Sequence, residues 1–258
     1  MTDLPPPVRH KLVVAYRGTN YCGWQTQLVP GKDELPTIQS TLRMALQRTV
    51  NHPVTLVGSS RTDSGVHATG QVAHFDSHRP QIAPEKLVAA TNAKLPSDIA
   101  IVSAEPVAAS FDAIGSTVRK GYRYRVRDAA MKDVFAGDLS YHVARPLDVG
   151  AMQSAAAHLV GEHDFASFAK PGHGRETTVR TIELLSVRRE AGEVMIDVSG
   201  SGFLWHMVRI IAGTLVEIGL GRRKAAAMPG VLRAADREAS GPTAPAMGLC
   251  LMWIETID

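Results

Sequence analysis

The stretch from Thr117 to Arg127, TVRKGYRYRVR, constrains the fold more than any other part of this sequence. Side chains alternate between two faces in a β-strand. Tyr122, Tyr124 and Val126 therefore share one face in a predicted strand, and the arginines at positions 123, 125 and 127 share the other. Two uses fit this pattern. The tyrosines stack on a base while the arginines pair with phosphate, or the strand is an ordinary amphipathic one with core tyrosines and solvated arginines.

Length and composition restrict the class of protein. The chain has 258 residues, enough for one large domain or two small ones, each with its own core. Hydrophobic residues make up 45% and charged residues 21%, which is ordinary for a globular protein. The formal charge is +3 and the isoelectric point is near 8.9, so net charge permits nucleic-acid binding without indicating it.

Several classes of protein are disfavoured. Cys22 and Cys250 lie far apart and form no CxxC pattern, so neither a disulfide framework nor a structural zinc site is expected. The opening MTDLPPPVRH is proline-rich and lacks an apolar core, which indicates a short disordered arm over residues 1–10 and no signal peptide. The sequence contains no run of about 18 apolar residues, so no membrane-spanning helix is expected. A cytoplasmic location is expected.

A polar segment between two apolar runs is the strongest candidate for chemistry. The stretch Gly58–Phe75 reads GSSRTDSGVHATGQVAHF, and its glycine-flanked polar part predicts a loop held between two strands. Asp63 is the only carboxylate between Asn51 and Phe75, and Arg61 lies two residues before it. A nearby arginine favours an ionised carboxylate. An aspartate that bonds its own turn backbone is the plainer alternative, and composition does not choose between them.

This segment resembles a known signature. RTDSGVHATGQVAHF is similar to the RTDAGVHA.GQV.HF motif of the tRNA pseudouridine synthase A (TruA) family. The resemblance implies that Asp63 is the nucleophile, and that Arg61, His67 and Gln71 contact the substrate. The chain departs from the motif in Ser60 before the arginine and in Ser64 after the aspartate, and both residues are small.

Further motifs continue the resemblance from about residue 11 to 254. Residues 17–27 resemble YDGT.Y.GWQ.Q, with Arg17 in place of the aspartate, and Trp24 is expected to anchor this loop in the core. Residues 120–124 resemble R.YRY, which implies that Tyr122 is the active-site tyrosine. Ile114 replaces a basic residue of the family's F.ARF.A, which puts an RNA contact there in doubt.

The last two motifs supply the remaining site residues. Residues 203–209 resemble F.HHMVR, whose arginine approaches the catalytic aspartate and corresponds to Arg209. An arginine in this apolar segment otherwise reaches solvent or pairs structurally. The closing A.A.GL.L places Leu249 at a leucine that lines the family's uracil pocket; without the resemblance it is an ordinary core leucine.

The resemblance implies an α+β pseudouridine synthase fold. Two ferredoxin-like halves form one continuous, mostly antiparallel sheet with a central active-site cleft, and we expect them at residues 11–112 and 113–258. The local patterns predict a helix capped by Thr37, a strand over 54–57 and a loop over 169–178. They also predict a hairpin around Ala191-Gly192, a helix over 202–219 ending at Gly219, and a strand over 244–254.

The implied activity is isomerisation of uridine to pseudouridine at nucleotides 38–40 of the tRNA anticodon stem-loop by a homodimer. Asp63 would attack while paired with Arg209. Arg61 would contact RNA or flip the base. Tyr122 and Leu249 would line the uracil pocket, and Tyr122 could also assist proton loss from C5. The reaction involves no redox change, so neither a cofactor nor a metal is expected.

Two other classes fit parts of the sequence. The triplet Asp63-Ser64-Gly65 is also found in aspartic proteases that share two aspartates across a dimer. Arg61 argues against that class, because a nearby cation would keep both carboxylates charged. A non-catalytic RNA-binding or tRNA-folding protein is the other alternative. An anion in an RNA site opposes binding, so the retained Asp63 disfavours that alternative.

Overall fold

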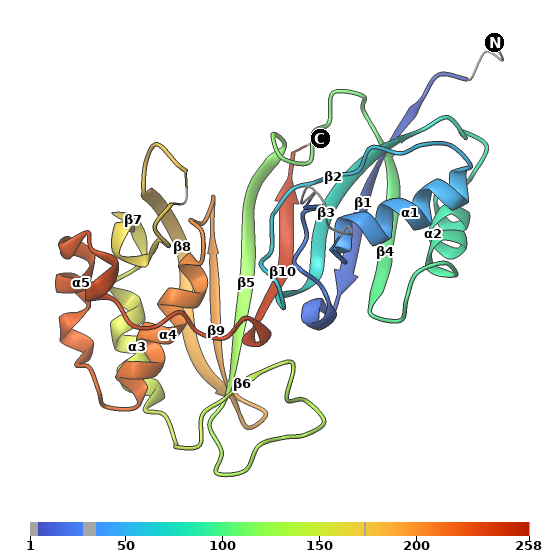
Figure 1. Ribbon diagram of the computed structural model, residues 1–258. Helices are drawn as coiled ribbons and strands as arrows, with labels where there is room; N and C mark the ends of the chain where they lie inside the picture. Colours follow the sequence, from blue (N-terminus) through green and yellow to red (C-terminus); the bar gives the residue numbers. More distant parts are fainter. Residues whose placement is uncertain (1–4, 28–34, 173, 258) are drawn as a thin grey trace. The chain divides into compact units, whose positions relative to one another are not determined.

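The computed structural model describes residues 5–27, 35–172 and 174–257 (Figure 1). In these residues the fold is mixed α+β with a large, mostly antiparallel ten-stranded sheet, as the sequence predicts. The chain divides into two compact units, which are residues 1–118 with 251–258, and residues 119–250. The expected boundary at residues 112 and 113 therefore lies slightly early, and the expected second half includes a C-terminal segment that returns to the first unit.

The first unit follows the order strand, helix, strand, strand, helix, strand. Its elements are β1 (Val8–Tyr16), α1 (Ile38–Val50), β2 (Val57–Gly58), β3 (His67–Ser77), α2 (Pro84–Asn92) and β4 (Ile99–Val107). The strands lie in the order β4-β1-β3, with β2 paired to β3, and all of these pairs are antiparallel. This is the ferredoxin-like arrangement. β10 (Leu249–Thr256) lies beside β3 as a further strand.

Local sequence explains the helices of this unit, which pack together beside its strands (Figure 1). Thr37 caps α1, because its side chain accepts from the Ser40 backbone amide while the Ser40 side chain accepts from the Thr37 amide. A buried stripe then faces the sheet at Ile38, Leu42 and Leu46. The predicted cap is confirmed.

β1 begins earlier than expected. Val8, Arg9 and His10 are already paired with residues 75–77 of β3, so these residues are not part of a disordered arm. Arg9 holds this end in place, since its guanidinium makes two 2.8 Å bonds to Asp76 and donates to the carbonyl oxygens of Ala109 and Phe111. Local composition does not reveal contacts with residues so distant in sequence.

The second unit has a four-strand core with helices packed against it. Its elements are β5 (Thr117–Arg127), β6 (Tyr141–His142), α3 (Val149–Ala157), β7 (Gly161–Asp164), β8 (Val179–Glu190), β9 (Glu193–Gly200), α4 (Met207–Gly219) and α5 (Met228–Ala234). The strands lie in the order β5-β9-β8-β7 with antiparallel pairs, and β6 pairs with β5 in parallel. α3 packs against β8 and α4. The first residues of β5, Thr117 and Val118, belong to the first unit.

Two predictions for this unit are confirmed. β5 spans the predicted residues, and its tyrosine face is buried while its arginine face is half-buried. The hairpin turns at Ala191-Gly192, whose φ angles of 49° and 80° suit a two-residue turn between twisted strands.

Three predicted elements differ from the structure. β2 is limited to Val57–Gly58, whereas a strand over 54–57 was expected. α4 begins at Met207 and not at residue 202, because His206 adopts a left-handed conformation with φ 62°. The chain leaves this helix at Gly221, which has φ 74°, while Gly219 is its last helical residue. β10 begins at Leu249, after a 3-10 turn at Ala246–Gly248, and not at residue 244.

None of the helices in the described residues is long and apolar enough to cross a membrane. In the same residues, no group of three or more histidine, cysteine, aspartate or glutamate side chains has the proximity needed to hold a metal ion.

Candidate active site

Asp63 lies in a short turn between β2 and β3 of the first unit. The amide of Val66 donates to the Asp63 carbonyl oxygen over 3.1 Å and closes this turn. The Asp63 residue is half-buried and the next residue, Ser64, is exposed, whereas Val66 and His67 at the end of the turn are buried. The carboxylate-bearing residue is therefore carried at the edge of a well-packed loop, where a side chain can meet a ligand while its backbone stays fixed.

The residue before Asp63 is held from two sides. The carbonyl oxygen of Thr62 accepts from the Trp24 amide over 3.1 Å, and the Thr62 hydroxyl bonds the Tyr16 hydroxyl over 2.9 Å. Gly23 makes this approach possible. With φ 90°, it lies so close that a β-carbon there would be 2.6 Å from the Thr62 oxygen. The two sequence motifs, residues 17–27 and 58–75, thus form one local structure.

Trp24 anchors this structure, as expected. Its side chain is fully buried. The indole ring packs on Gly58 at the start of the Asp63 loop, where a β-carbon would lie 2.3 Å from the ring atoms. A bulky aromatic residue against a bare backbone fixes the distance between the two segments.

The structure places His67 and Gln71 inside the unit, below the loop. The His67 ring accepts a 3.1 Å hydrogen bond from the Gly18 amide. Gln71 is fully buried; its amide nitrogen donates to the Ser60 carbonyl oxygen over 2.6 Å and its oxygen accepts from the Ser60 amide over 3.2 Å. These contacts favour a role in holding the loop. The expectation that both side chains touch substrate remains a prediction.

Arg61 has the opposite environment. It is exposed, and within the described part of the chain it makes no hydrogen bond or ion pair. Its neighbours on either side, Ser60 and Thr62, are buried. The guanidinium group therefore extends from a fixed backbone into solvent and is available to an external partner.

Tyr122 lies on β5 in the second unit, on the same strand face as Tyr124. Its residue is 8% exposed, and its ring meets the edge of the Phe203 ring with centroids 5.3 Å apart. Tyr124 is fully buried and donates its hydroxyl to the Pro245 carbonyl oxygen over 2.7 Å. Burial raises the pKa of Tyr124 well above its usual range. Of the two tyrosines, Tyr124 belongs to the core and Tyr122 lies at the margin of it.

The sequence patterns do not indicate the contact between Phe203 and Tyr122. The apolar run over 202–219 was assigned to one helix, which gives no reason for Phe203 to contact β5. Its position four residues before α4 is the one signal for this contact, because aromatic residues before a helix often pack against a neighbouring element.

Arg209 lies in the first turn of α4 and is tied to the segment before β10. Its Nε donates to the Ala244 carbonyl oxygen over 2.9 Å, and the Ala244 amide donates back to the Arg209 carbonyl oxygen over 3.0 Å. The reciprocal pair fixes the base of the guanidinium group. Leu249, at the start of β10, is 6% exposed. The preceding Gly248 packs on the Tyr124 ring, where a β-carbon would lie 2.5 Å from a ring atom.

The predicted site residues thus fall into two groups. Asp63, Arg61, His67 and Gln71 belong to the first unit, and they share one loop and the strand after it. Tyr122, Arg209 and Leu249 belong to the second unit, where the Tyr124 region and residues 244–249 connect them. The expected ion pair between Asp63 and Arg209 stays a prediction.

The arginines on the basic face of β5 lie next to carboxylates of the same unit. Arg123 pairs with Asp197 over 2.7 Å, Arg125 pairs with Glu193 over 2.8 Å, and Arg127 lies 3.3 Å from Asp133. Each arginine is therefore engaged by a protein carboxylate and is not simply solvated.

Asp197 shows how this network is stabilised. Burial alone raises the pKa of a carboxyl group. At Asp197 burial is opposed by hydrogen bonds from Arg123 and Arg188, and the balance keeps the pKa of this carboxyl below its usual value. The network stabilises the sheet and holds its arginines in place.

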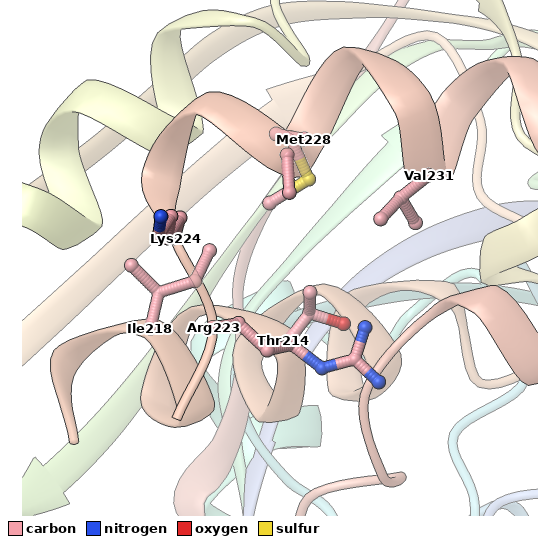
Figure 2. A pocket seen from close by; sticks show the side chains of 7 residues that line it. Thr214, Ile218, Arg223, Lys224, Met228 and Val231 are labelled. Atoms are coloured by element: carbon pink, nitrogen blue, oxygen red, sulfur yellow. The ribbon is translucent and has the colours of Figure 1, made fainter. Parts of the chain in front are cut away.

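A cavity of about 200 Å³ lies in the second unit (Figure 2). It is lined by side chains of α4, α5 and the connection between them: Thr214, Ile218, Arg223, Lys224, Ala227, Met228 and Val231. Arg223 donates to the carbonyl oxygens of Ala239 and Ser240, so its charge caps backbone groups. No predicted site residue lines this cavity.

Comparison with known proteins bears on all of these motifs. A family model described as tRNA pseudouridine synthase matches residues 12–114 and 155–255. The tRNA pseudouridine synthase A of Moorella thermoacetica is 45% identical over 245 residues, which cover 95% of this chain and 98% of that protein. That of Geotalea uraniireducens is 44% identical over 94% of this chain and 97% of its own length. That of Myxococcus xanthus is 44% identical over 94% of this chain and 90% of its own length. The chain therefore belongs to the tRNA pseudouridine synthase A family of isomerases.

Proposed function

We propose that this chain converts uridine to pseudouridine at nucleotides 38–40 in the anticodon stem-loop of tRNA. The observation that carries the proposal is the loop around Asp63. A single half-buried aspartate is displayed on a backbone that Trp24, Tyr16 and Gln71 hold from different sides. Such fixation suits a nucleophile, which has to meet one atom of its substrate with little freedom of movement.

The reaction moves a base without a change of oxidation state. The bond between the ribose C1′ and the uracil N1 breaks, and a bond from C1′ to the uracil C5 forms. C5 loses a proton and N1 gains one, so atoms and electrons balance within the nucleotide and water. In our proposal Asp63 is the nucleophile that allows the first bond to break.

The second unit supplies the remaining roles in this proposal. Arg209, fixed by Ala244, pairs with Asp63 and keeps it ionised, since an adjacent cation favours the charged form of a carboxyl group. Tyr122 and Leu249 are nearly buried, and they wall the uracil while it turns. The Tyr122 side chain also assists the loss of the C5 proton to a base or to water.

Arg61 is assigned to the RNA. Its exposed guanidinium group, directly beside the fixed Thr62 and Asp63, is suited to bind a phosphate or to occupy the space of the flipped nucleotide. A target base has to leave its stack before Asp63 can reach the nucleotide, and that step costs a few kcal/mol.

We also propose a cytoplasmic homodimer that binds tRNA. The loop between β5 and β6 supports the dimer, because Met131 and Val134 are each 80% exposed and Phe135 is 95% exposed. Neighbouring large apolar side chains at such exposure are typical of interaction surfaces. Sedimentation of the purified chain tests the dimer, and a Phe135→Ser variant is expected to shift it toward monomer.

The activity test uses an unmodified tRNA transcript, in which pseudouridine is mapped by chemical labelling after incubation. The wild type is expected to form pseudouridine in the anticodon stem-loop, and Asp63→Asn is expected to form none while it still binds the tRNA. Asp112→Asn is the matched control, because Asp112 is an exposed aspartate of the same unit. Binding by the wild type without any product would instead indicate an RNA-binding protein on a synthase fold.

A further inference from the structure

Arg180 is a cation that the proposed chemistry does not use. It lies near the start of β8 and is half-buried. Its Nη1 donates to the carbonyl oxygens of Thr177 and Val179, over 3.1 and 2.5 Å. Within the described residues its Nε and Nη2 groups make no hydrogen bond and it forms no ion pair. A guanidinium group carries five N–H donors, so most of them remain available.

Most arginines on the neighbouring sheet surface differ from Arg180. Arg123, Arg125 and Arg188 each pair with a carboxylate. Placing a cation in a half-buried position without a carboxylate costs free energy, because solvation is lost and no opposite charge replaces it. An arginine kept in that state is suited to an anion that arrives from outside.

Two glycines lie between Lys120 and Arg180, and one of them leaves space for a ligand. Gly200 at the end of β9 pairs with Lys120 of β5 on one side and with Ile182 of β8 on the other. Gly202 follows, and a β-carbon there would lie 3.9 Å from the Arg180 side chain. A β-carbon at Gly200 would lie 2.2 Å from the Thr181 carbonyl oxygen, so the space is at Gly202, where a ligand can approach the backbone closely beside Arg180.

Lys120 lies both beside the backbone of residues 200–202 and next to the proposed site. It precedes Tyr122 by two residues on β5, so both side chains share one face and their backbones lie about 7 Å apart along the strand. Phe203, which contacts the Tyr122 ring, directly follows Gly202. The backbone of residues 200–202 therefore adjoins the side of the uracil pocket that the proposed function assigns to Tyr122.

A third cation, Arg175, completes a group of like charges. Burial lowers the pKa of Lys120, and the positive charge of Arg175 lowers it further. The pKa of Arg180 is lowered by burial and by Arg175 in the same way. The positive charge of Arg175 thus disfavours the charge of both Lys120 and Arg180, and a bound anion would relieve this repulsion.

We propose that Lys120, Arg175 and Arg180, named here the basic cluster, bind a backbone phosphate of the substrate RNA next to the target uridine. This inference rests on the proposed function. Arginine donors in a fork match phosphate oxygens, and phosphate contacts set the register of a protein on its nucleic acid. The cluster would hold the strand that leads to the flipped nucleotide while Tyr122 contacts the base.

The test measures binding of the full-length protein to an anticodon stem-loop hairpin RNA as a function of salt. Each lost phosphate contact is expected to reduce the slope of log K against log salt by about 0.7 to 0.9. Arg180→Gln and Arg175→Gln should each show such a loss. Arg180→Lys keeps the charge and should retain most of the slope. Arg222→Gln is the control, because Arg222 is exposed and already pairs with Glu217 over 2.7 Å.

A second measurement locates the phosphate. Hairpins carry a neutral methylphosphonate at one position at a time around the target uridine. At the contacted position the wild type should lose affinity, whereas Arg180→Gln, which has already lost the contact, should lose little more. Equal losses for both proteins at every position, or an unchanged salt slope in Arg180→Gln, would overturn the inference.

The two proposals fail in different ways. A wild type that forms no pseudouridine in tRNA contradicts the proposed function. A wild type that forms pseudouridine, together with an Arg180→Gln variant whose salt slope and methylphosphonate pattern match the wild type, contradicts only the basic cluster.

Discussion

The Trp24 ring lies directly on the backbone of Gly58, so that a β-carbon at position 58 would be 2.3 Å from the indole. The two residues come from different motifs, and their contact sets the position at which the chain enters the Asp63 loop. A flexible side chain would move aside at such a distance, but a fully buried indole has no space to do so.

Gly58→Ala is therefore expected to destabilise the protein by about 1–3 kcal/mol, because the added methyl group overpacks a rigid core. The loss should appear as a lower urea midpoint, with a fall in activity for the molecules that remain folded. Gly230→Ala is the control, since nothing lies within 4 Å of its added β-carbon. Combining Gly58→Ala with Trp24→Leu should restore part of the stability; a purely additive loss would contradict the contact.

Gln71→Ala removes both hydrogen bonds between the Gln71 side chain and the backbone of the buried Ser60. We expect a loss of about 2 kcal/mol in the free energy of unfolding. If Gln71 acts by holding the loop, the rate of the chemical step should fall while tRNA affinity changes little. A large loss of affinity with an unchanged single-turnover rate would instead support substrate contact by Gln71.

Stability should depend on pH through two histidines of the first unit. Burial lowers the pKa of His74, and the charge of Arg9 lowers it further; burial also lowers the pKa of His10. The ordinary value is 6.5, so below that pH the unfolded state binds more protons than the folded state. The free energy of unfolding is therefore expected to fall as the pH drops below about 6.5.

His74 gives this prediction a specific test. Its Nδ1 accepts a 3.0 Å hydrogen bond from the Ala113 amide, and protonation of that atom breaks the bond. His74→Gln keeps an acceptor without the titration, so its urea midpoint should vary less between pH 7 and pH 5 than that of the wild type. His158→Gln, at an exposed histidine, should keep the wild-type dependence.

Arg123→Gln tests the role assigned to the basic face of β5. Because Arg123 already pairs with Asp197, the variant should leave the salt slope of RNA binding unchanged. It should lower stability by about 1 kcal/mol, since Arg188 continues to partner Asp197. A slope reduced as much as in Arg180→Gln would show that this face binds phosphate after all.

Much of the fold follows from local patterns. β5 alternates strictly and α1 carries both a cap and an apolar stripe, so sequence and tertiary structure favour the same elements. The run before α4 misleads, because Phe203, Leu204 and Trp205 continue the apolar pattern although they are not helical. The Lys170 amide bonds the Trp205 carbonyl oxygen, and His206 turns left-handed. Such tertiary contacts override the helical pattern.

The site was less accessible to sequence reasoning. Spacing alone left Asp63 either a nucleophile or a turn residue, and the resemblance to a family distinguished the two. His67 and Gln71 belong to the same motif as Asp63, yet they bond the backbone of their own unit. A motif shows which residues occur together in the sequence. Only the structure shows which of their side chains support the loop and which are exposed to solvent. Arg180 belongs to no motif and emerged from its half-buried, carboxylate-free position.

The return of β10 to the first unit affects how the protein is made. A nascent chain usually folds its N-terminal domain before the next one leaves the ribosome. Here β3 already pairs with β1 and β2, but it gains β10 on its other side only when residues 251–257 emerge, after the whole second unit has been synthesised. Until then one edge of β3 is unpaired. In the folded protein the backbone of Met252 and Trp253 packs directly against Gly70 at this edge. β10 thus completes the unit that carries Asp63, and chains released before β10 is made should lack a finished Asp63 unit.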